Sequence, residues 1–313
     1  MRIQAVLVGM VVLVTACVSS PHPTVGGGTG SCPLFPADSF GNARVDQLPV
    51  HPRSAAWQNS IGINSVVHPD FGAGLWEGSP IGIPYATVSG AQAKVPISFD
   101  YAGESDPGPY PFPADVPVEG GSDRHVIVVD TDNCLLYETF DSHLLGNGSW
   151  SAGSGARWNL RSNALRPAGW TSADAAGLAI LPGLVRYEEV AAGQIDHMVR
   201  FTAPRTQRGF VWPARHFASS EDDPDLPPMG AVFRLRPEVD LSGFSPQARV
   251  IAQALKTHGM ILADNGSPWF LSGVPDARWD NDGLRDLRSL TGTDFEAVDM
   301  SSLMVDPGSG QVR

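Results

Sequence analysis

Short apolar runs separated by turn residues constrain this chain more than any other feature. Gly and Pro, at 34 and 27 of 313 residues, interrupt the sequence throughout, yet the apolar runs between them persist. The pattern predicts many short strands joined by tight turns rather than disorder or long helices. The clearest candidate strands are 95–101, 125–130, 134–140, 198–203, 209–214, 231–237, 260–266 and 268–274. "DTDN" at 130–133 and "DNGS" at 264–267 predict hairpin turns, the second through its Asn-Gly pair.

One main helix is expected at 245–259. Ser245 is placed to act as its N-cap, Pro246 suits the first helical position, and Gly259 can end it. The apolar residues of this segment fall on one face at helical spacing: Ala248, Ile251, Ala252 and Leu255. Short helical turns are expected at 172–178, 184–192 and 283–290. Strands in this number with one principal helix predict a mainly β single domain, built as a two-sheet sandwich or jelly roll.

The N-terminus predicts export. Residues 1–16 hold one positive charge, Arg2, followed by an apolar stretch that is short for a bilayer span, which is typical of a signal peptide. Val14-Thr15-Ala16-Cys17 resembles the lipobox of bacterial lipoproteins, which implies that Cys17 is lipidated with acyl chains and anchors the protein at the cell envelope. Residues 17–31 are rich in Ser, Pro, Gly and Thr and predict a flexible tether. An ordinary signal peptide with a chance cysteine is the alternative.

Two further cysteines suit an oxidising compartment. With Cys17 lipidated, Cys32 and Cys134 remain, and we expect them to form a disulfide. Closing a loop of about a hundred residues would contribute roughly 4–5 kcal/mol in the chain-entropy model. Two buried free thiols are the alternative.

The body is expected to be one β-rich domain over 32–300, followed by a tail at 301–313, because no second linker and no internal repeat interrupts it. The formal net charge of the chain is −12, and removing the signal peptide with Arg2 makes it −13. Acidity of this size without a basic stripe argues against a nucleic-acid partner and against electrostatic docking on anionic lipids. The oligomeric state is left open.

Two segments carry a family resemblance. "SNALRPAGWTSADAAGL" (162–178) and "ADNGSPWFLSGVPDARW" (263–279) resemble a family of secreted bacterial proteins with no established activity. The similarity extends from 32–40 to 295–299. It implies export and a shared fold, and it assigns no catalytic residue.

The motifs that the chain lacks narrow its possible chemistry. It contains no G-x-S-x-G, no H-E-x-x-H, no phosphate-binding P-loop and no C-x-x-C. Exported proteins also meet little free nucleotide cofactor. The enzyme classes that remain use side chains or a metal, and they include glycoside hydrolysis, polysaccharide elimination and peptide hydrolysis.

The candidate catalytic residues are Asp174, Asp196, His197 and His216. A glycosidase needs one carboxyl as an acid and another as a base or nucleophile, and Asp174 and Asp196 are the candidates, with His197 or His216 in support. Helix capping is the alternative role for Asp174. Turn chemistry, or a hydrogen-bonded inner histidine, is the alternative for Asp196 and His197.

The candidate substrate-binding residues are Arg161, Arg166, Trp158 and Trp170. Guanidinium groups bind carboxylates bidentately, and aromatic faces stack on sugar rings. Core packing is the alternative for the tryptophans. His125, His197 and His216 each adjoin an apolar run, and they would form a metal site if the fold brought them together. Unrelated positions are the alternative.

Three functional hypotheses follow. The first is an exported, membrane-tethered enzyme, a glycoside hydrolase or other polysaccharide-degrading protein that needs no cofactor. The second is a non-catalytic surface lipoprotein that binds a glycan or a protein partner. The third is a metal-dependent hydrolase, which needs three ligands within coordination distance.

Overall fold

A computed structural model describes residues 24–25 and 28–313 of the chain. Cys17, the signal peptide and most of the expected tether lie outside the described residues. The helices are α1 (Ser54–Ile61), α2 (Tyr187–Ala192), α3 (Pro246–Thr257) and α4 (Asn281–Leu284), with 3-10 turns η1 (Phe40–Asn42), η2 (Ala102–Glu104), η3 (Leu181–Gly183), η4 (Arg285–Ser289) and η5 (Gly292–Asp294). None of the described helices has the length and apolar character needed to span a bilayer.

Within the described residues, strands predominate and form four sheets, which confirms the expected mainly β class. The five-stranded sheet contains β1 (Thr24–Val25), β5 (Ala86–Val88), β7 (Val126–Asp130), β8 (Leu135–Phe140) and β11 (Ser154–Asn159), in that order. The three-stranded sheet contains β6 (Ile97–Phe99), β10 (Trp150–Ala152) and β9 (His143–Leu144), in that order. The six-stranded sheet runs β16 (Phe295–Val298), β13 (Val232–Leu235), β14 (Met260–Asn265), β12 (Val199–Ala203), β15 (Phe270–Ser272) and β2 (His68–Asp70), and β3 (Leu75–Trp76) pairs with β4 (Ser79–Pro80).

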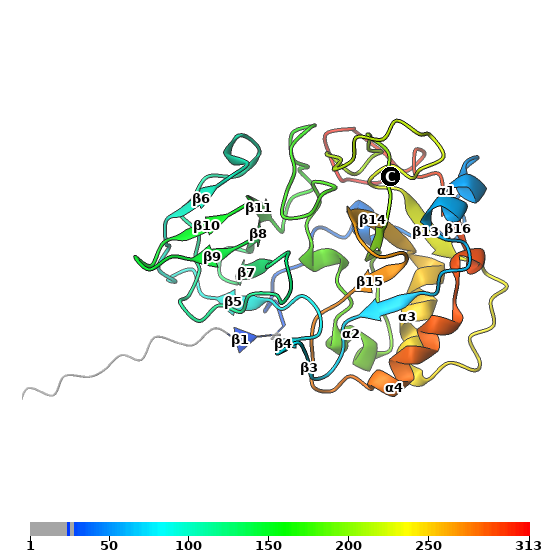
Figure 1. Cartoon of the computed structure of the whole chain (residues 1–313), viewed down its shortest axis with the longest axis horizontal. Coiled ribbons are helices and arrows are strands. Elements are labelled where there is room, and N and C mark those ends of the chain that lie inside the picture. Colours follow the sequence, from blue (N-terminus) through cyan, green and yellow to red (C-terminus); the bar gives the residue numbers. More distant parts are fainter. Residues whose placement is uncertain (1–23, 26–27) are drawn as a thin grey trace, which may run out of the picture.

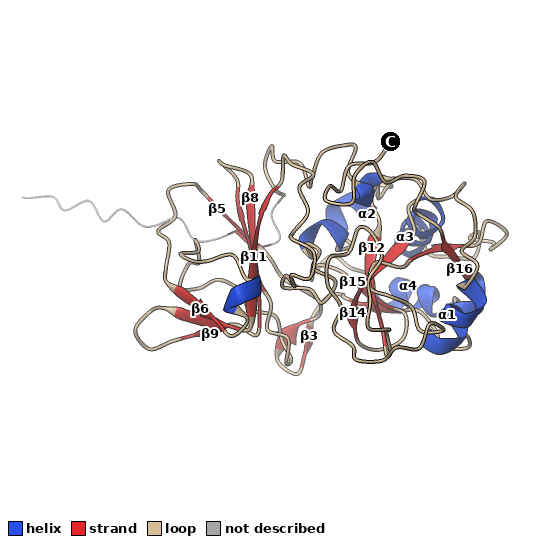
Figure 2. Ribbon diagram, turned by 90° about the horizontal axis from the view of Figure 1, so that it is seen from above, coloured by secondary structure: helices blue, strands red, loops and turns tan. Residues whose placement is uncertain are grey.

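The sheets gather into two lobes (Figures 1 and 2). The first lobe holds the five- and three-stranded sheets, and the second holds the six-stranded sheet with α1, α3 and α4. In the first lobe, Val126 and Val128 belong to a hydrophobic cluster that also takes Trp150 of the three-stranded sheet, so these two sheets form a small sandwich. The intervening Ile127 and Val129 face the opposite cluster, as the alternation along a strand requires.

The second lobe was not anticipated as a separate unit. Its sheet is mixed, since β12 is parallel to β14 and antiparallel to β15. Four fully buried rings pack at its centre: Phe201, Phe233, Trp269 and Phe295. The first lobe is therefore a sandwich, as expected. The second lobe is instead a sheet covered by helices.

The expected main helix is confirmed. α3 starts at Pro246 after Ser245 and is followed by Gly259 with φ of +73°, and its buried residues include the whole predicted face. The Ser245 hydroxyl does not cap the helix and instead donates to the carbonyl oxygen of Gly283 at 2.7 Å. Helical turns occur within 184–192 and 283–290, while 172–178 forms turns without a helix.

One strand expectation and one hairpin expectation are wrong. Residues 209–214 form no strand and make only an isolated bridge from Phe210 to Met229. The turn at 264–267 does not close a hairpin, because β12 lies between β14 and β15. Asn-Gly favours a local hairpin, but β12 arrives from a distant part of the chain and occupies the pairing edge instead.

The Cys32–Cys134 disulfide is present, with Cα atoms 5.3 Å apart and a sequence separation of 102 residues. It joins the start of the body to the turn between β7 and β8. That turn is confirmed as a hairpin, and the Asp130 carboxylate accepts from the backbone N–H groups of Asp132 and Asn133, both at 3.1 Å.

A polar cleft between the two lobes

A polar cleft lies where the two lobes meet, and it consists of two adjoining hollows. Both are lined by Asp123, Asp264 and Asn265, and they enclose about 650 and 1020 Å³ including space open to solvent. The first hollow is completed mainly by Asp70, Glu119, His125, Arg200, Thr202 and Ser272. The second is completed mainly by Glu104, Thr171, Ser172, Asp174 and His216. We call these residues the polar cleft.

Strand alternation in the second lobe supplies one wall of the cleft. Phe201 and Leu271 point into the core, so their neighbours Arg200, Thr202 and Ser272 point to the other face of the sheet. A register shift after Phe201 pairs Thr202 with Asp264 instead of Ala263. This irregularity places the Asp264 carboxyl beside the Arg200 guanidinium, at 3.4 Å between Oδ2 and Nη2.

Arg200 and Asp174 form the central ion pair of the cleft. Nε and Nη2 of Arg200 donate to the two carboxylate oxygens of Asp174 at 2.9 and 2.8 Å. The Asp174 side chain is fully buried, and that of Arg200 is 7% exposed. Nη1 of Arg200 donates to Ser272 Oγ at 2.6 Å, so the guanidinium is held on three sides. This bidentate geometry is the strong form of a charge-assisted pair.

Asp264 is a carboxyl of the cleft whose pKa is strongly raised. Burial, and after it the negative charge of Asp174, raise the pKa of Asp264 to about 7, although Arg200 opposes the shift. Its side chain nevertheless remains 24% exposed and lines both hollows. A carboxyl whose pKa is raised toward neutral pH and whose side chain reaches a cleft has the properties of a general acid.

Glu119 and His125 form a second buried pair at the first-lobe wall. Nδ1 of His125 faces Glu119 Oε2 in a short contact, and Nε2 lies 3.0 Å from the carbonyl oxygen of Ala173. Both ring nitrogens face oxygens, so the imidazolium, which donates from both, fits the site. Burial alone would lower the pKa of His125, but the Glu119 carboxylate outweighs it and raises the pKa to about 9.

His216 lines the second hollow, and one of its two ring nitrogens, Nδ1, is already hydrogen-bonded within the protein. Nδ1 lies 2.9 Å from the carbonyl oxygen of Ala175, which can only accept, so Nδ1 carries a proton. Nε2 lies 3.7 Å from Glu104 Oε2. Asp174 and His216, two of the sequence-predicted catalytic residues, therefore line one hollow together.

The other two predicted catalytic residues lie elsewhere. Asp196, with 71% of its side chain exposed, and His197 line a separate hollow beside Glu189. His197 Nδ1 lies 2.8 Å from the Met198 carbonyl oxygen and Nε2 lies 3.1 Å from Glu189 Oε2. This is the inner, hydrogen-bonded setting given above as the alternative for a histidine, and Asp196 shares no hollow with Asp174.

Of the four predicted substrate-binding residues, Trp158 and Arg166 are buried, Trp170 is half-buried and Arg161 is exposed. Arg166 is buried, lies over the rings of Trp158 and Trp170 at 5.6 and 5.5 Å, and donates to Asp106 Oδ2 at 2.6 Å. Arg161 is exposed and lines none of the cleft. Five of the eight tryptophans are buried, so most of them serve packing: Trp57, Trp150, Trp158, Trp269 and Trp279.

The three candidate metal-ligating histidines are not brought together. His125, His197 and His216 have different partners, Glu119, Glu189 and Ala175, as described above. Among residues 28–313, no group of three His, Cys, Asp or Glu side chains has the geometry to hold a metal ion.

Sequence reasoning missed Arg200, Asp264 and the Glu119–His125 pair. Arg200 interrupts the apolar run "MVRF", and Asp264 ends the run "MILAD". In both cases a charged residue within or at the end of an apolar strand could have indicated a functional position, because an unpaired charge is costly to bury. Glu119 had no such signal, since it lies in a loop.

Comparison with known proteins finds no family model that matches the chain, no matching curated protein and no matching solved structure. The family resemblance noted from the sequence therefore stays a prediction.

Proposed function

We propose that this protein is an exported, envelope-anchored glycan-cleaving enzyme whose active site is the polar cleft. The observation that carries the proposal is Asp264, whose pKa is raised to about 7 while its side chain remains accessible from both hollows. Glycoside cleavage needs a proton donor at the leaving oxygen, and a carboxyl poised near neutral pH meets that need.

The remaining cleft residues suit the other requirements of the reaction. Asp123 lines both hollows with Asp264 and would be the second carboxyl, which acts on the opposite side of the sugar. The His216 ring, which lines the second hollow, can form a hydrogen bond through Nε2 with a water or a substrate hydroxyl. Asn265 and Thr202 add amide and hydroxyl groups of the kind that recognise polyhydroxylated ligands. Arg200 contacts Asp264 and is itself held by the buried Asp174, so the two residues of this ion pair would position the acid.

The test is a screen of the purified chain against bacterial and plant polysaccharides, which follows new reducing ends and unsaturated products. Asp264→Asn keeps the shape of the side chain and removes the acid, so we expect a loss of about 100-fold or more in rate. Asp196→Asn is the matched control, because Asp196 is an exposed carboxylate outside the cleft. Cleavage that survives in Asp264→Asn would refute the assignment of the acid.

Cleavage by the wild type should also fall as the pH rises through about 7, because the acid form of Asp264 is then lost. The variant Asp264→Asn should lack this step in any residual activity. A rate that stays constant from pH 6 to pH 8 would argue against Asp264 as the proton donor.

The anchor can be tested separately. Lipidation of Cys17 predicts that labelled palmitate is incorporated into the expressed chain and that Cys17→Ser abolishes the incorporation. Without lipid, the same variant should move from the membrane fraction to the aqueous fraction.

A non-catalytic glycan-binding lipoprotein is the second candidate, and one observation favours it. Leu75 and Trp76 are 66% and 72% exposed on the β3–β4 hairpin. The hairpin lies between Asp70 and Ile83, both of which line the cleft. An exposed aromatic ring beside a polar cleft can stack on a sugar without any chemistry. Glycan binding without cleavage, equal in wild type and Asp264→Asn, would favour this candidate.

A further inference from the structure

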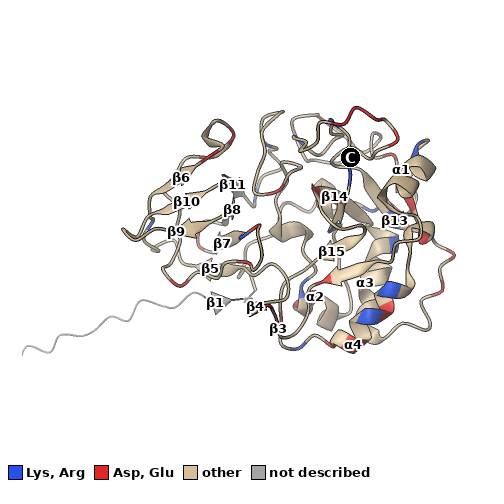
Figure 3. Ribbon diagram, in the orientation of Figure 1, with Lys and Arg blue, Asp and Glu red and all other residues tan. Residues whose placement is uncertain are grey.

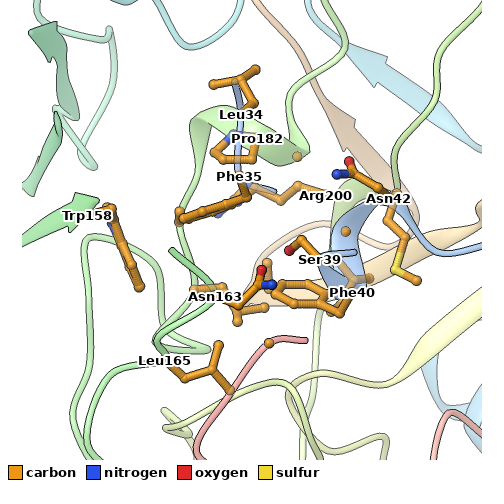
Figure 4. Close-up of a pocket in the computed structure, with 18 of the residues that line it drawn as sticks. Leu34, Phe35, Ser39, Phe40, Asn42, Trp158, Asn163, Leu165, Pro182 and Arg200 are labelled. Atoms are coloured by element: carbon orange, nitrogen blue, oxygen red, sulfur yellow. The ribbon is translucent and has the colours of Figure 1, made fainter. Parts of the chain in front are cut away.

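The polar cleft has room for sugar rings, whereas a second pocket lined by Arg200 does not. The free volume within the two hollows of the cleft is about 210 and 460 Å³. Figure 4 shows the second pocket, where Phe35, Phe40 and Trp158 surround a free volume of about 40 Å³. A space of that size holds no more than a few water molecules. Recognition of a glycan through Arg200 or its neighbours therefore belongs to the cleft.

Carboxyl groups outnumber cationic side chains around the cleft. Its two hollows are lined by Asp70, Glu104, Glu119, Asp123, Asp174 and Asp264. Among the described lining residues, Arg200 is the one arginine, and there is no lysine. Arg200 neutralises Asp174, and the His125 imidazolium neutralises Glu119. The formal charge of the cleft is therefore negative, and a cleft lined by one sign of charge concentrates ligands of the opposite sign.

Three of these carboxyl groups have no arginine or lysine within ion-pairing distance anywhere in residues 28–313: Asp70, Glu104 and Asp123. Asp70 ends β2 in the second lobe, whereas Glu104 ends η2 and Asp123 precedes β7 in the first lobe. A ligand held between the lobes therefore meets unpaired carboxyl groups on both sides.

The cationic groups of the cleft are already used within the protein. Arg200 donates to both oxygens of Asp174 and to Ser272, and His125 contacts Glu119 through Nδ1. An acidic sugar is best bound by a guanidinium whose planar edge is free for its carboxylate. The cleft lacks that group among its described residues, so its charges disfavour acidic sugars.

One of the unpaired carboxyl groups lies beside an exposed aromatic ring. Tyr101 is 58% exposed and lines the second hollow together with Glu104. The two residues share a tight turn, in which the N–H of Glu104 donates to the carbonyl oxygen of Tyr101 at 3.0 Å. An aromatic face can stack on a sugar ring while a nearby carboxylate accepts hydrogen bonds from an ammonium group on the same sugar.

We propose that the polar cleft selects polysaccharides of amino sugars that carry free ammonium groups, such as polymers of glucosamine without its acetyl groups. Glu104 and Asp70 are the specificity-determining residues, and Tyr101 supports the sugar ring. This inference rests on the proposed role of the cleft in glycan recognition. It concerns binding, so its test does not require cleavage.

The test compares tetramers of β-1,4-linked glucosamine and N-acetylglucosamine, which share a backbone and differ in charge. Binding is measured by isothermal titration calorimetry at pH 6 in the wild type and in Asp264→Asn, which lacks the proposed acid and so should not consume the ligand. We expect the glucosamine tetramer to bind at least about tenfold more tightly, the effect of a hydrogen bond between charged groups. Raising the salt from about 50 to about 500 mM should weaken this binding and leave that of the acetylated tetramer unchanged.

Three variants that each remove one negative charge locate the recognition. Glu104→Gln and Asp70→Asn should each lower the affinity for the glucosamine tetramer about tenfold and change that for the acetylated tetramer by less than about twofold. Asp196→Asn is the matched control, because its carboxylate is exposed outside the cleft, and it should change neither affinity. Glutamine keeps an oxygen that can accept from the Thr171 N–H, as Glu104 does at 3.2 Å, so the local fold is preserved.

Spermine separates recognition of the sugar from recognition of charge alone, because it carries as many ammonium groups as the tetramer. Tyr101→Ala should weaken binding of both tetramers and leave that of spermine unchanged. The proposal is overturned if the acetylated tetramer binds as tightly as the charged one, if spermine does so, or if Glu104→Gln and Asp70→Asn behave as Asp196→Asn does. Cleavage of neutral glycans without ammonium-selective binding would overturn this inference alone, whereas selective binding without cleavage would support it and refute the enzyme.

Discussion

Replacing Asp174 by Asn tests whether the central ion pair holds the two lobes' facing surfaces in place. Asp174 is fully buried and accepts two hydrogen bonds from Arg200. Removing one member of a buried pair costs about 3–5 kcal/mol, because the other charge is left without compensation. Asp264, 3.4 Å from Arg200, can take over part of the pairing. We therefore expect a cost near the lower limit, about 3 kcal/mol.

The assay is urea unfolding at pH 7 with the disulfide intact. A loss of about 3 kcal/mol should lower the unfolding midpoint by about 1 M, given the steep urea dependence of a chain of this size. Asp46→Asn is the control, because it breaks an ion pair of similar length, Arg44–Asp46 at 2.6 Å, whose arginine is 66% exposed. Exposed pairs contribute little, so its midpoint should barely change.

Equal midpoints for Asp174→Asn and Asp46→Asn would refute the reasoning. A double variant provides a second check. Asp174→Leu with Arg200→Met removes both charges and should recover most of the stability lost in Asp174→Leu alone, since no unpaired charge is then buried. Two losses that simply add would show that the pair is not coupled in this way.

The remaining predictions concern pH, the disulfide and the exposed hairpin. The raised pKa of His125, about 9 against 6.5, stabilises the fold fully below pH 6.5. This contribution, at most about 3 kcal/mol, is lost as the pH rises through 9, and urea unfolding at pH 6 and 9 should show a drop that Glu119→Gln largely removes. Cys32→Ser should cost about 4 kcal/mol, because the disulfide closes a loop of about a hundred residues, and reduction of the wild type should match it in urea unfolding. Trp76→Ala should leave the unfolding midpoint unchanged, because the side chain is 72% exposed, yet weaken glycan binding in a pull-down on insoluble polysaccharide. A Trp76→Ala variant with full glycan affinity would remove the hairpin from the binding surface.

Local features were predictable because they depend on neighbours in the chain. The α3 helix begins at Pro246 and ends before Gly259, as these two residues indicate, although the Ser245 hydroxyl does not cap it. The β7–β8 hairpin follows from Asp130 and the turn after it. Helix α1 was missed, because the residue before it, Arg53, is not one of the residue types that favour an N-cap and the pattern of the helix is weakly amphipathic.

The sequence predicts the net charge of the chain but not where the charged residues lie in the fold. Lys and Arg positions are scattered over both lobes in Figure 3, between acidic ones. The absence of a nucleic-acid partner stays a prediction. The composition could not show that a few charges would be buried together at one junction.

By itself, the sequence determined the strand content, the main helix and the Cys32–Cys134 disulfide. Strands and helix depend on residues that are neighbours in the chain. The disulfide was predictable because only two cysteines remain once Cys17 is assigned to the lipobox. Which residues meet in the polar cleft was decided only by the tertiary structure. Arg200 meets Asp174 from 26 residues away and Asp264 from 64, and His125 meets Ala173 from 48. Such contacts depend on which strand occupies a sheet edge, as β12 does between β14 and β15. That outcome reflects the packing of whole lobes, which no short stretch of residues encodes.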